Sequence, residues 1–237
     1  MKPRIAVFSG SGISAESGIP TYRSEDGLWA NYKIEDVCTH EAMYFNRHQV
    51  IQFYNERRRE AMTKQPNAAH LAVSKLAEYF DVDVITQNID DLHERAGSKN
   101  VVHLHGSLFE LRSMERYEPV IPIHEDQDED ATATDGELLR PNIVFFGEGV
   151  PKLSEAIEKI QMCDILIVVG TSLAVSPANS LVTCVRNQSV PIYVVDPGNP
   201  KINFISNPVH YIKEKASTGM TRLVEELITK YQGIQKA

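Results

Sequence analysis

Cysteine is scarce in this sequence, and its spacing excludes two kinds of cross-linked protein. The 237 residues contain three cysteines, Cys38, Cys163 and Cys184, and no two of them form a CxxC pair. A disulfide framework and a cysteine zinc site both need cysteines in paired or clustered spacing. We therefore expect neither. Sparse, unpaired cysteines are typical of a protein from the reducing cytoplasm.

Long hydrophobic runs and basic patches are also missing. No apolar run reaches the roughly 20 residues that a membrane-spanning helix needs. The apolar part of the N-terminus, MKPRIAVFSG, is too short for a signal peptide and leads directly into a glycine loop. No basic patch is interleaved with aromatic residues, as nucleic-acid binding would require. The sequence predicts a cytoplasmic protein with neither a membrane nor a nucleic acid as its partner.

Negative charge is concentrated in one short segment. The formal net charge is −8, but residues 125–137 contain seven acidic residues and no basic one. The rest of the chain is therefore nearly neutral. Such a run is typical of a solvated, mobile loop and does not indicate an acidic field over the whole protein.

Short apolar runs alternate with helical patterns along the chain, and most of the runs end in glycine, serine, threonine or aspartate. This alternation predicts an α/β fold with a doubly wound, Rossmann-like parallel sheet. The predicted strands are residues 4–8, 83–86, 101–104, 142–146, 164–169, 191–195 and 209–212. The predicted helices are residues 45–62, 67–79, 154–162 and 218–230.

These elements fit a single domain over the whole chain, with two additions to its core. The core consists of residues 1–21, 81–110 and 141–237. Residues 22–80 form a helical insertion that begins with a loop beside the site. Residues 111–140 have no clear periodicity and are predicted to form a small module.

The loop after the first strand has the glycine-rich sequence SGSGISAESG. Gly10 and Gly12 let backbone N–H groups approach a ligand closely, and Ser14 begins a helical-looking segment. The pattern is typical of a pyrophosphate cradle, but Gly18 lies six positions after Gly12, whereas the dinucleotide fingerprint has about three. No strand ending in an acidic residue follows about 20 residues later either. On spacing alone, a phosphate-binding loop and a plain glycine turn both remain open.

A second polar loop, residues 86–105, follows a buried strand and contains Gln87, Asn88, Asp90 and His105. Open α/β sheets hold their ligands in loops of this kind. His105 is the first candidate for proton transfer, because histidine titrates near neutral pH. Each residue alone has an ordinary structural explanation, since asparagine and aspartate are common in turns. Four such groups in one loop, with a second small-residue loop GTSLAVSPA elsewhere, favour a ligand site.

The chain resembles a known family in five segments that occur in order over nearly its whole length. The segments are GSGISAESGIPTYR, TQNIDDLHERAG, LHGSL, LRPNIVFFGEGVP and GTSLAVSPA. Together they resemble the sirtuins, the NAD-dependent protein deacylases. The resemblance implies NAD as the cofactor and the acylated lysine side chains of proteins or peptides as substrate. It also implies transfer of the acyl group to ADP-ribose, with nicotinamide as both product and inhibitor.

The resemblance implies the residues of the NAD site as well. The residues expected to contact NAD are Gly10, Ser11, Gly12, Ile13, Ser14, Tyr22, Arg23, Gln87, Asn88, Ile89, Asp90, Gly170, Thr171, Ser172 and Asp196. Ser14, Asn88 and Asp90 would line the pocket that receives nicotinamide, where they can hydrogen-bond its carboxamide. Gln87 and His105 would flank the nicotinamide ribose. His105 would be the catalytic residue, the base that deprotonates a ribose hydroxyl.

The substrate side of the site is implied in the same way. The strand-like edge to which a peptide would add consists of Val144, Phe145, Phe146, Gly147, Glu148 and Val150. An apolar tunnel over the acyl-lysine would exclude water and limit plain hydrolysis of NAD. Phe145 and Phe146 are candidate walls of this tunnel, although a role in the core is the alternative for one of them.

Tyr54 and Arg57, in the segment FYNERRRE, resemble a pair found in sirtuins that prefer succinyl- and malonyl-lysine. A spacing of three residues puts both on one helix face, where a guanidinium and a phenol can pair an acyl carboxylate. On the residues alone, the run 57–59 indicates a solvated basic face; the resemblance favours the acyl-carboxylate role. We therefore expect a deacetylase with desuccinylase and demalonylase activity.

Several residues depart from the family pattern. Sirtuins usually have four cysteines between the catalytic histidine and the LRP segment, but residues 109–140 contain none, and Ser113 stands where the first is expected. We therefore predict no structural zinc. Ser11 and Tyr22 replace the usual alanine and phenylalanine. Near Val194 the family commonly has an asparagine that contacts the adenosine ribose. Either Asp196 contacts those hydroxyls in its place, or the adenosine contact is weaker.

Two other functions remain open. A protein mono-ADP-ribosyltransferase would use the same NAD site with a protein nucleophile in place of an acyl-lysine, but the retained Tyr54 and Arg57 disfavour it. A non-catalytic NAD-sensing module is hard to reconcile with the retained His105, Asn88 and Asp90.

Overall fold

The chain folds around a six-stranded parallel sheet. The computed structural model describes residues 2–21, 32–118 and 120–235. In spatial order the strands of this sheet are β3 (Val101–His103), β2 (Asp81–Thr86), β1 (Arg4–Ser9), β7 (Ile165–Val169), β8 (Ile192–Val195) and β9 (Val209–Ile212). All neighbouring strands are parallel, so the predicted α/β fold is confirmed.

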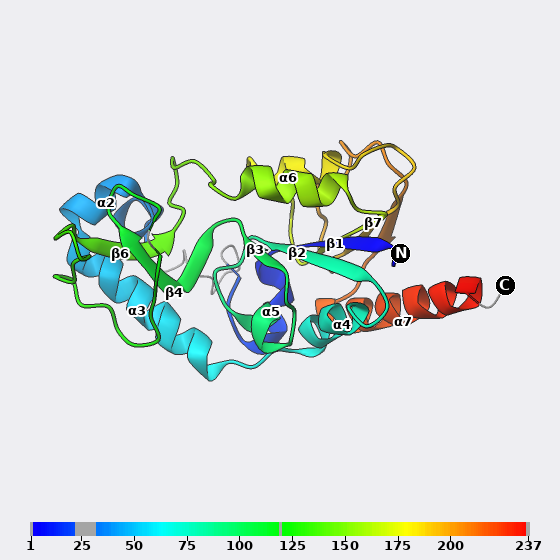
Figure 1. The fold of residues 1–237 in the computed structure, drawn as a ribbon, viewed down its shortest axis with the longest axis horizontal. Coiled ribbons are helices and arrows are strands. Elements are labelled where there is room, and N and C mark those ends of the chain that lie inside the picture. The colour runs from blue at the N-terminus through cyan, green and yellow to red at the C-terminus, as the bar shows by residue number, and fades with distance from the viewer. Residues whose placement is uncertain (1, 22–31, 119, 236–237) are drawn as a thin grey trace.

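Helices cover both faces of this sheet, which explains why its strands are apolar almost throughout. They are α4 (Ala68–Leu76), α6 (Leu153–Gln161), α7 (Ala216–Gln235) and the 3₁₀ helix η4 (Ala178–Thr183). On one face, α4 and α7 pack in the hydrophobic core that contains Ile5 and Val7 of β1. On the other, α6 and η4 pack in the core that contains Ala6 and Phe8 (Figure 1). In the described part of the chain, no helix is both long and apolar enough to span a bilayer.

The strand order predicts where a ligand would bind. The chain runs from β1 outward to β2 and β3, and it then returns to the other side of β1 and continues through β7, β8 and β9. The order therefore reverses between β1 and β7. Open α/β sheets bind ligands beyond the carboxyl ends of their strands at such a point. The loops that follow β1, β2 and β7 are thus expected to hold the ligand.

A smaller lobe lies beside the main sheet (Figure 1). It contains a three-stranded sheet of β5 (Ile121–Pro122), β4 (Gly106–Ser113) and β6 (Leu139–Ile143), with helices α1 (Ile34–Val37), α2 (His40–Phe45) and α3 (Arg47–Thr63). Its core includes Phe53 and Tyr54 of α3, Leu108 and Phe109 of β4, and Phe145. Helix α4 packs on the main sheet instead, and the short helix α5 (Leu92–Arg95) follows β2.

The prediction of a main-fold strand at residues 142–146 was wrong in its extent and its partner. The strand is β6, which ends at Ile143 and pairs antiparallel with β4 in the smaller sheet. The apolar run NIVFF indicates a strand, but it contains no information about the partner. That partner, β4, was not predicted, because it mixes apolar and charged residues without a clean alternation.

The acidic segment at residues 125–137 was predicted to be a solvated, mobile loop; most of its residues are exposed, but α3 anchors it at Gln127 and Glu129. The Asn55 Nδ2 donates to the Gln127 carbonyl oxygen at 2.9 Å, and the Asn55 Oδ1 accepts from the Gln127 N–H at 2.8 Å. Arg47 donates to the Glu129 carbonyl oxygen at 2.6 Å. Gln127 is buried. The segment is held because side chains from a distant helix satisfy its backbone groups.

Candidate active site

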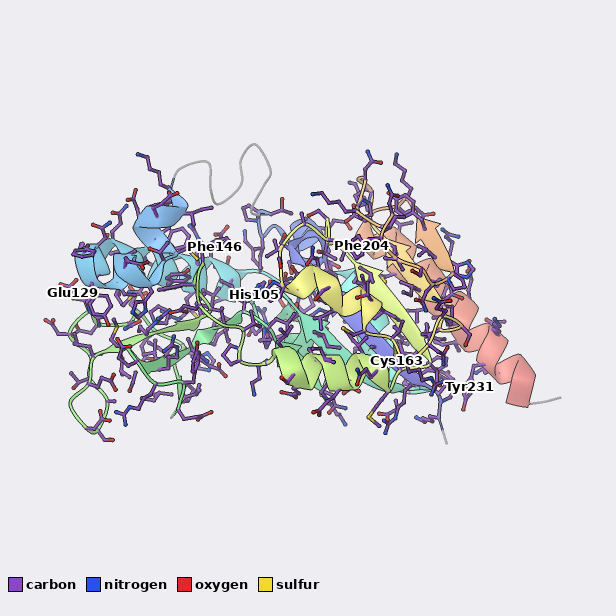
Figure 2. All side chains as sticks on the ribbon, turned by 90° about the horizontal axis from the view of Figure 1, so that it is seen from above. His105, Glu129, Phe146, Cys163, Phe204 and Tyr231 are labelled. Atoms are coloured by element: carbon purple, nitrogen blue, oxygen red, sulfur yellow. The ribbon has the colours of Figure 1, made fainter. Side chains whose placement is uncertain are left out.

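A large cavity lies between the smaller lobe and the main sheet, where β1, β2 and β7 end. Its volume is about 760 Å³, and His105 marks its position in Figure 2. The predicted cofactor residues that line it are Gly10, Ser11, Gly12, Ser14, Gln87, Asn88, Ile89, Asp90, Gly170, Thr171, Ser172 and Asp196. The other predicted residues that line it are His105, Tyr54, Arg57, Val144, Phe145, Phe146, Gly147, Glu148 and Val150. Tyr22 and Arg23 lie outside the described residues, and the Ile13 side chain is buried in the core.

The loop after β1 packs against the loop after β7 through backbone contacts. The Gly10 N–H donates to the Val169 carbonyl oxygen at 3.1 Å, and the Gly12 N–H donates to the Gly170 carbonyl oxygen at 2.8 Å. A Cβ atom on Gly12 would lie 2.7 Å from the Gly170 Cα, closer than a side chain allows. These glycines are therefore required for the close approach of two loops. The approach brings both loop backbones to the cavity wall.

The prediction that a helix begins at Ser14 was wrong. The segment forms two short 3₁₀ turns, η1 (Ser11–Ile13) and η2 (Ala15–Ser17). Gly18 then adopts a left-handed conformation with φ of 84°, and Pro20 follows, so the turns do not extend into an α-helix. The loop therefore offers a ligand its backbone and hydroxyl groups and does not present a helix N-terminus.

The loops after β7 and β8 form one end of the cavity. The Gln87 Nε2 donates to the Thr171 Oγ1 at 3.0 Å, which joins the loops after β2 and β7. Asp196 follows β8, and its Oδ1 accepts from the Gly198 N–H at 2.8 Å. Burial raises the pKa of Asp196, and this hydrogen bond opposes the rise. A carboxylate in this position can accept hydrogen bonds from sugar hydroxyls.

His105 lies where the two lobes meet, and its hydrogen bond defines its tautomer. Its Nδ1 is 3.0 Å from the Gln87 carbonyl oxygen. A carbonyl oxygen can only accept, so Nδ1 carries the proton and Nε2 keeps a basic lone pair. Burial lowers the pKa of His105, and the hydrogen bond to Gln87 offsets part of the change. The imidazole is therefore neutral at neutral pH and can accept a proton from a hydroxyl group.

Ser14, Asn88 and Asp90 form one buried hydrogen-bond network. The Ser14 Oγ donates to the Asp90 Oδ2 at 3.0 Å and accepts from the Asn88 Nδ2 at 3.0 Å. The Asp90 Oδ1 accepts from the Leu92 N–H at 3.1 Å. Burial raises the pKa of Asp90, while the hydrogen bonds from Leu92 and Ser14 lower it.

Asn88 contributes an acceptor to this part of the cavity that has no partner. Asn88 is 4% exposed, and its Oδ1 makes no hydrogen bond within the described residues. A buried carbonyl oxygen without a donor is unfavourable by about 1–3 kcal/mol. A ligand with an N–H group, such as a carboxamide, would satisfy it.

Tyr54 and Arg57 come from one face of α3 and lie in the same cavity wall. The Tyr54 hydroxyl donates to the Cys38 Sγ at 3.4 Å, and its ring stacks on Phe145 with centroids 5.8 Å apart. The Arg57 Nε lies 3.3 Å from the Glu60 carboxylate, and the Arg57 side chain is 21% exposed. Arg57 is therefore a largely enclosed cation beside an aromatic wall.

The two phenylalanines in the segment after β6 differ in how far they are buried. Phe145 is 2% exposed and Phe146 is 49% exposed, so the first belongs to the wall and core while the second reaches the surface (Figure 2). The Val144 N–H donates to the His105 carbonyl oxygen at 3.0 Å, and the Phe146 N–H donates to the Cys38 carbonyl oxygen at 3.0 Å. These two bonds fix the segment along the cavity.

Glu148 is held by a buried arginine that sequence analysis missed. Arg140 is fully buried, and its two terminal nitrogens donate to the Glu148 carboxylate at 2.6 and 3.2 Å. Burial alone raises the pKa of Glu148, but the hydrogen bonds and charge of Arg140 outweigh it and hold the pKa below its usual value. The carboxylate also accepts from the Phe145 N–H at 2.8 Å. This ion pair fixes the turn that follows the two phenylalanines. The position of Arg140 in the LRP segment was the available signal.

The absence of zinc stays a prediction. Among the described residues, no group of three or more His, Cys, Asp or Glu side chains could hold a metal ion, and Ser113 is buried at the end of β4. Elemental analysis of the purified protein is expected to give far less than one zinc per chain. A chelator is expected to leave activity intact. Stoichiometric zinc whose removal abolishes activity would contradict the prediction.

Comparisons with known sequences identify relatives of the chain. The model of the Sir2 family matches residues 10–177. An NAD-dependent protein deacylase of Aggregatibacter actinomycetemcomitans is 54% identical over 209 residues, which cover 88% of this chain and 99% of that protein. An NAD-dependent protein deacylase of Helicobacter pylori is 43% identical over 224 residues, which cover 94% of this chain and 97% of that protein.

Solved structures share the fold. A complex of a Sir2 homologue with NAD is 34% identical, superposes with a TM-score of 0.85, and covers 97% of this chain and 91% of its own. A Sir2 structure with a deacetylated p53 peptide and 3′-O-acetyl-ADP-ribose is 29% identical, with a TM-score of 0.80, and covers 95% of this chain and 94% of its own.

Proposed function

The chain belongs to the Sir2 family and is an NAD-dependent protein deacylase, and on this basis we propose that it removes succinyl and malonyl groups as well as acetyl groups from lysine side chains. The observation that carries the proposed acyl preference is the position of Tyr54 and Arg57, which line the cavity together beside Phe145. An acetyl group has no terminal carboxylate for a guanidinium to pair. A succinyl or malonyl group ends in a carboxylate that the guanidinium can pair.

NAD fits the cavity at both ends. Bound NAD supplies the ADP-ribose to which the acyl group is transferred. At one end, the unpartnered Asn88 Oδ1 suits the carboxamide of the nicotinamide ring. At the other end, the closely packed loops at Gly12 and Gly170 bring backbone groups to the cavity, and Asp196 offers a carboxylate to sugar hydroxyls. We assign the nicotinamide end to Ser14, Asn88 and Asp90 and the adenosine end to Asp196.

The proposed catalytic base is His105. Its Nε2 is the basic nitrogen, because Nδ1–H is committed to the Gln87 carbonyl oxygen. A neutral imidazole in this position can take a proton from a ribose hydroxyl, so that the oxygen becomes a nucleophile toward the acyl carbon. Phe145 and the Tyr54 ring form an apolar wall that limits access of water to the reacting groups.

The proposed acyl pocket has an electrostatic feature that limits its selectivity. Arg57 already contacts the carboxylates of Glu60 at 3.3 Å and Glu56 at 3.7 Å. These contacts hold the guanidinium in place, and they also share its positive charge. We therefore expect a preference for acidic acyl groups that leaves deacetylation intact.

A panel of matched peptides tests the proposed function. The full chain is incubated with NAD and one peptide in its acetyl-, malonyl-, succinyl- and unmodified-lysine forms, and products are identified by mass spectrometry. We expect free lysine peptide and the corresponding O-acyl-ADP-ribose from all three acylated forms. Turnover of the acetyl peptide alone would contradict the proposed acyl range. ADP-ribosylated protein as the main product would indicate a transferase instead.

A further inference from the structure

Helix α4 begins with a reciprocal pair of hydrogen bonds. The Asn67 Oδ1 accepts from the Ala69 N–H at 2.9 Å, and the His70 Nδ1 accepts from the Asn67 N–H at 3.3 Å. This capping box satisfies N–H groups that a helix leaves without partners at its start. The cap alone uses one atom of each side chain, which leaves the Asn67 Nδ2 and the His70 Nε2 for other contacts.

Those remaining atoms hold the loop that follows β1. The Asn67 Nδ2 donates to the Ile13 carbonyl oxygen at 2.8 Å and to the Ser17 Oγ at 2.9 Å. The His70 Nε2 lies 3.5 Å from the Ser14 Oγ. Because the His70 Nδ1 accepts from an N–H group, its Nε2 carries the proton and is the donor toward Ser14. The helix start therefore contacts the loop at three residues, Ile13, Ser14 and Ser17.

His70 is neutral, as a ring that accepts at Nδ1 and donates at Nε2 must be. Its side chain is fully buried, and burial lowers its pKa to about 4. Its ring also meets the ring of His93 edge to face, with centroids 5.0 Å apart, and burial holds the pKa of His93 well below the usual histidine value. Both rings are therefore uncharged at neutral pH.

The Ser14 hydroxyl connects His70 to the two other residues at the proposed nicotinamide end of the cavity, Asn88 and Asp90. A hydroxyl has one proton to donate and two lone pairs to accept with. Here it donates to Asp90 and accepts from Asn88 and from His70. All three capacities are used, so the direction of the O–H bond is determined. The Asn88 amide is oriented in turn, with Nδ2 on Ser14 and Oδ1 left for a ligand.

We propose that Asn67 and His70 are positioning residues for NAD, which orient Ser14, Asn88 and Asp90 before nicotinamide enters. The inference rests on the proposed assignment of Asn88 and Asp90 to nicotinamide. Neither Asn67 nor His70 lines the cavity, so both act through the loop after β1.

Two substitutions separate the cap from the loop contacts. Asn67→Ser keeps a good helix cap but removes the Nδ2 donors. His70→Asn keeps an acceptor near the position of Nδ1 but removes the Nε2 donor. In each variant we expect KM for NAD and the inhibition constant of nicotinamide to rise by about three- to tenfold, a change of the size that one net hydrogen bond contributes. We expect kcat to stay within about twofold, since the loss acts on binding.

Ala72→Gly in the same helix is the matched control. It lowers stability through helix propensity but leaves the loop contacts in place, so the unfolding temperature is expected to fall while both constants stay unchanged. In a Ser14→Ala background, His70→Asn is expected to have little further effect on the two constants, because the acceptor it serves is gone.

Asp90→Asn distinguishes a failure of this inference from a failure of the pocket assignment. If Asp90→Asn raises both constants and the Asn67 and His70 variants do not, the positioning role is overturned. If Asp90→Asn leaves both constants unchanged, the assignment of nicotinamide to this pocket is wrong. Folded variants with raised constants, together with an unaffected Ala72→Gly, support the inference.

Discussion

His105→Ala is expected to slow acyl transfer by about two to four orders of magnitude, the usual loss when a general base is removed. The reason lies in the two ring nitrogens. Nδ1–H donates to the Gln87 carbonyl oxygen, so Nε2 is the only basic atom of the ring. Alanine provides no basic atom in its place. The test is single-turnover deacylation with saturating NAD and acetyl peptide, with thermal unfolding measured in parallel to show that the variant is folded.

The pH dependence provides a second measure of the same role. The base works only when it is neutral, and burial lowers the pKa of His105 below the ordinary value of 6.5. Activity should therefore fall as the pH drops through a midpoint below 6.5 and stay level above it. Deacylation by His105→Ala at a rate near that of the wild type would show that the base is elsewhere.

His103 is the matched control for this pH dependence. Its Nδ1 and Nε2 lie 2.8 Å from the Asn88 carbonyl oxygen and the Glu94 carboxylate, two groups that only accept. Burial lowers the pKa of His103, but the hydrogen bond and charge of Glu94 outweigh it and raise the pKa overall. A doubly hydrogen-bonded imidazolium cannot serve as the base, so His103→Gln is expected to keep the acid limb of the profile.

The parts of the molecule that sequence reasoning could predict depend on local patterns. The strands of the main sheet are short apolar runs, and Gly10 and Gly170 each follow one of them. Because parallel strands end at the same edge, the loops that contain Asn88 and His105 could be expected to meet there. The structure places these loops around one cavity. The prediction of an acyl pocket at Tyr54 and Arg57 depended on the family resemblance as well, because a spacing of three residues also fits a solvated helix face.

The parts that could not be predicted depend on contacts between distant segments. Arg140 pairs with Glu148 inside the smaller lobe, and hydrophobic periodicity does not predict a buried arginine; the LRP segment marks the position of Arg140 but not its partner. Cys38 accepts from Tyr54, although neither sequence neighbourhood indicates the other. The sequence shows His70 only as a polar residue in a largely apolar helix. Its contact with Ser14, in the loop after β1, depends on the packing of that loop against the helix. Periodicity predicts the elements, but it does not predict which polar side chains meet when they pack.

Arg57→Met is expected to reduce kcat/KM for succinyl-lysine peptide by about one to two orders of magnitude. A hydrogen-bonded charged contact contributes about 1.5–3 kcal/mol, and 1.36 kcal/mol corresponds to a factor of ten. Because Glu60 and Glu56 share the charge of Arg57, we expect the lower half of that range. Methionine keeps an unbranched apolar stem and loses only the guanidinium end, so the stem's packing against the cavity wall is largely retained. Deacetylation is expected to be unchanged or faster, since an acetyl group has no carboxylate to lose.

Tyr54→Phe is the matched variant that removes only a hydroxyl from the same pocket. The ring that stacks on Phe145 remains, so the wall is kept while one hydrogen-bond donor is lost. We expect the same bias against succinyl-lysine in a weaker form, because a neutral donor contributes less than a guanidinium. The ratio of desuccinylation to deacetylation is the quantity to measure in both variants. An equal fall of the two activities in Arg57→Met would show that Arg57 stabilises α3 and does not select the acyl group.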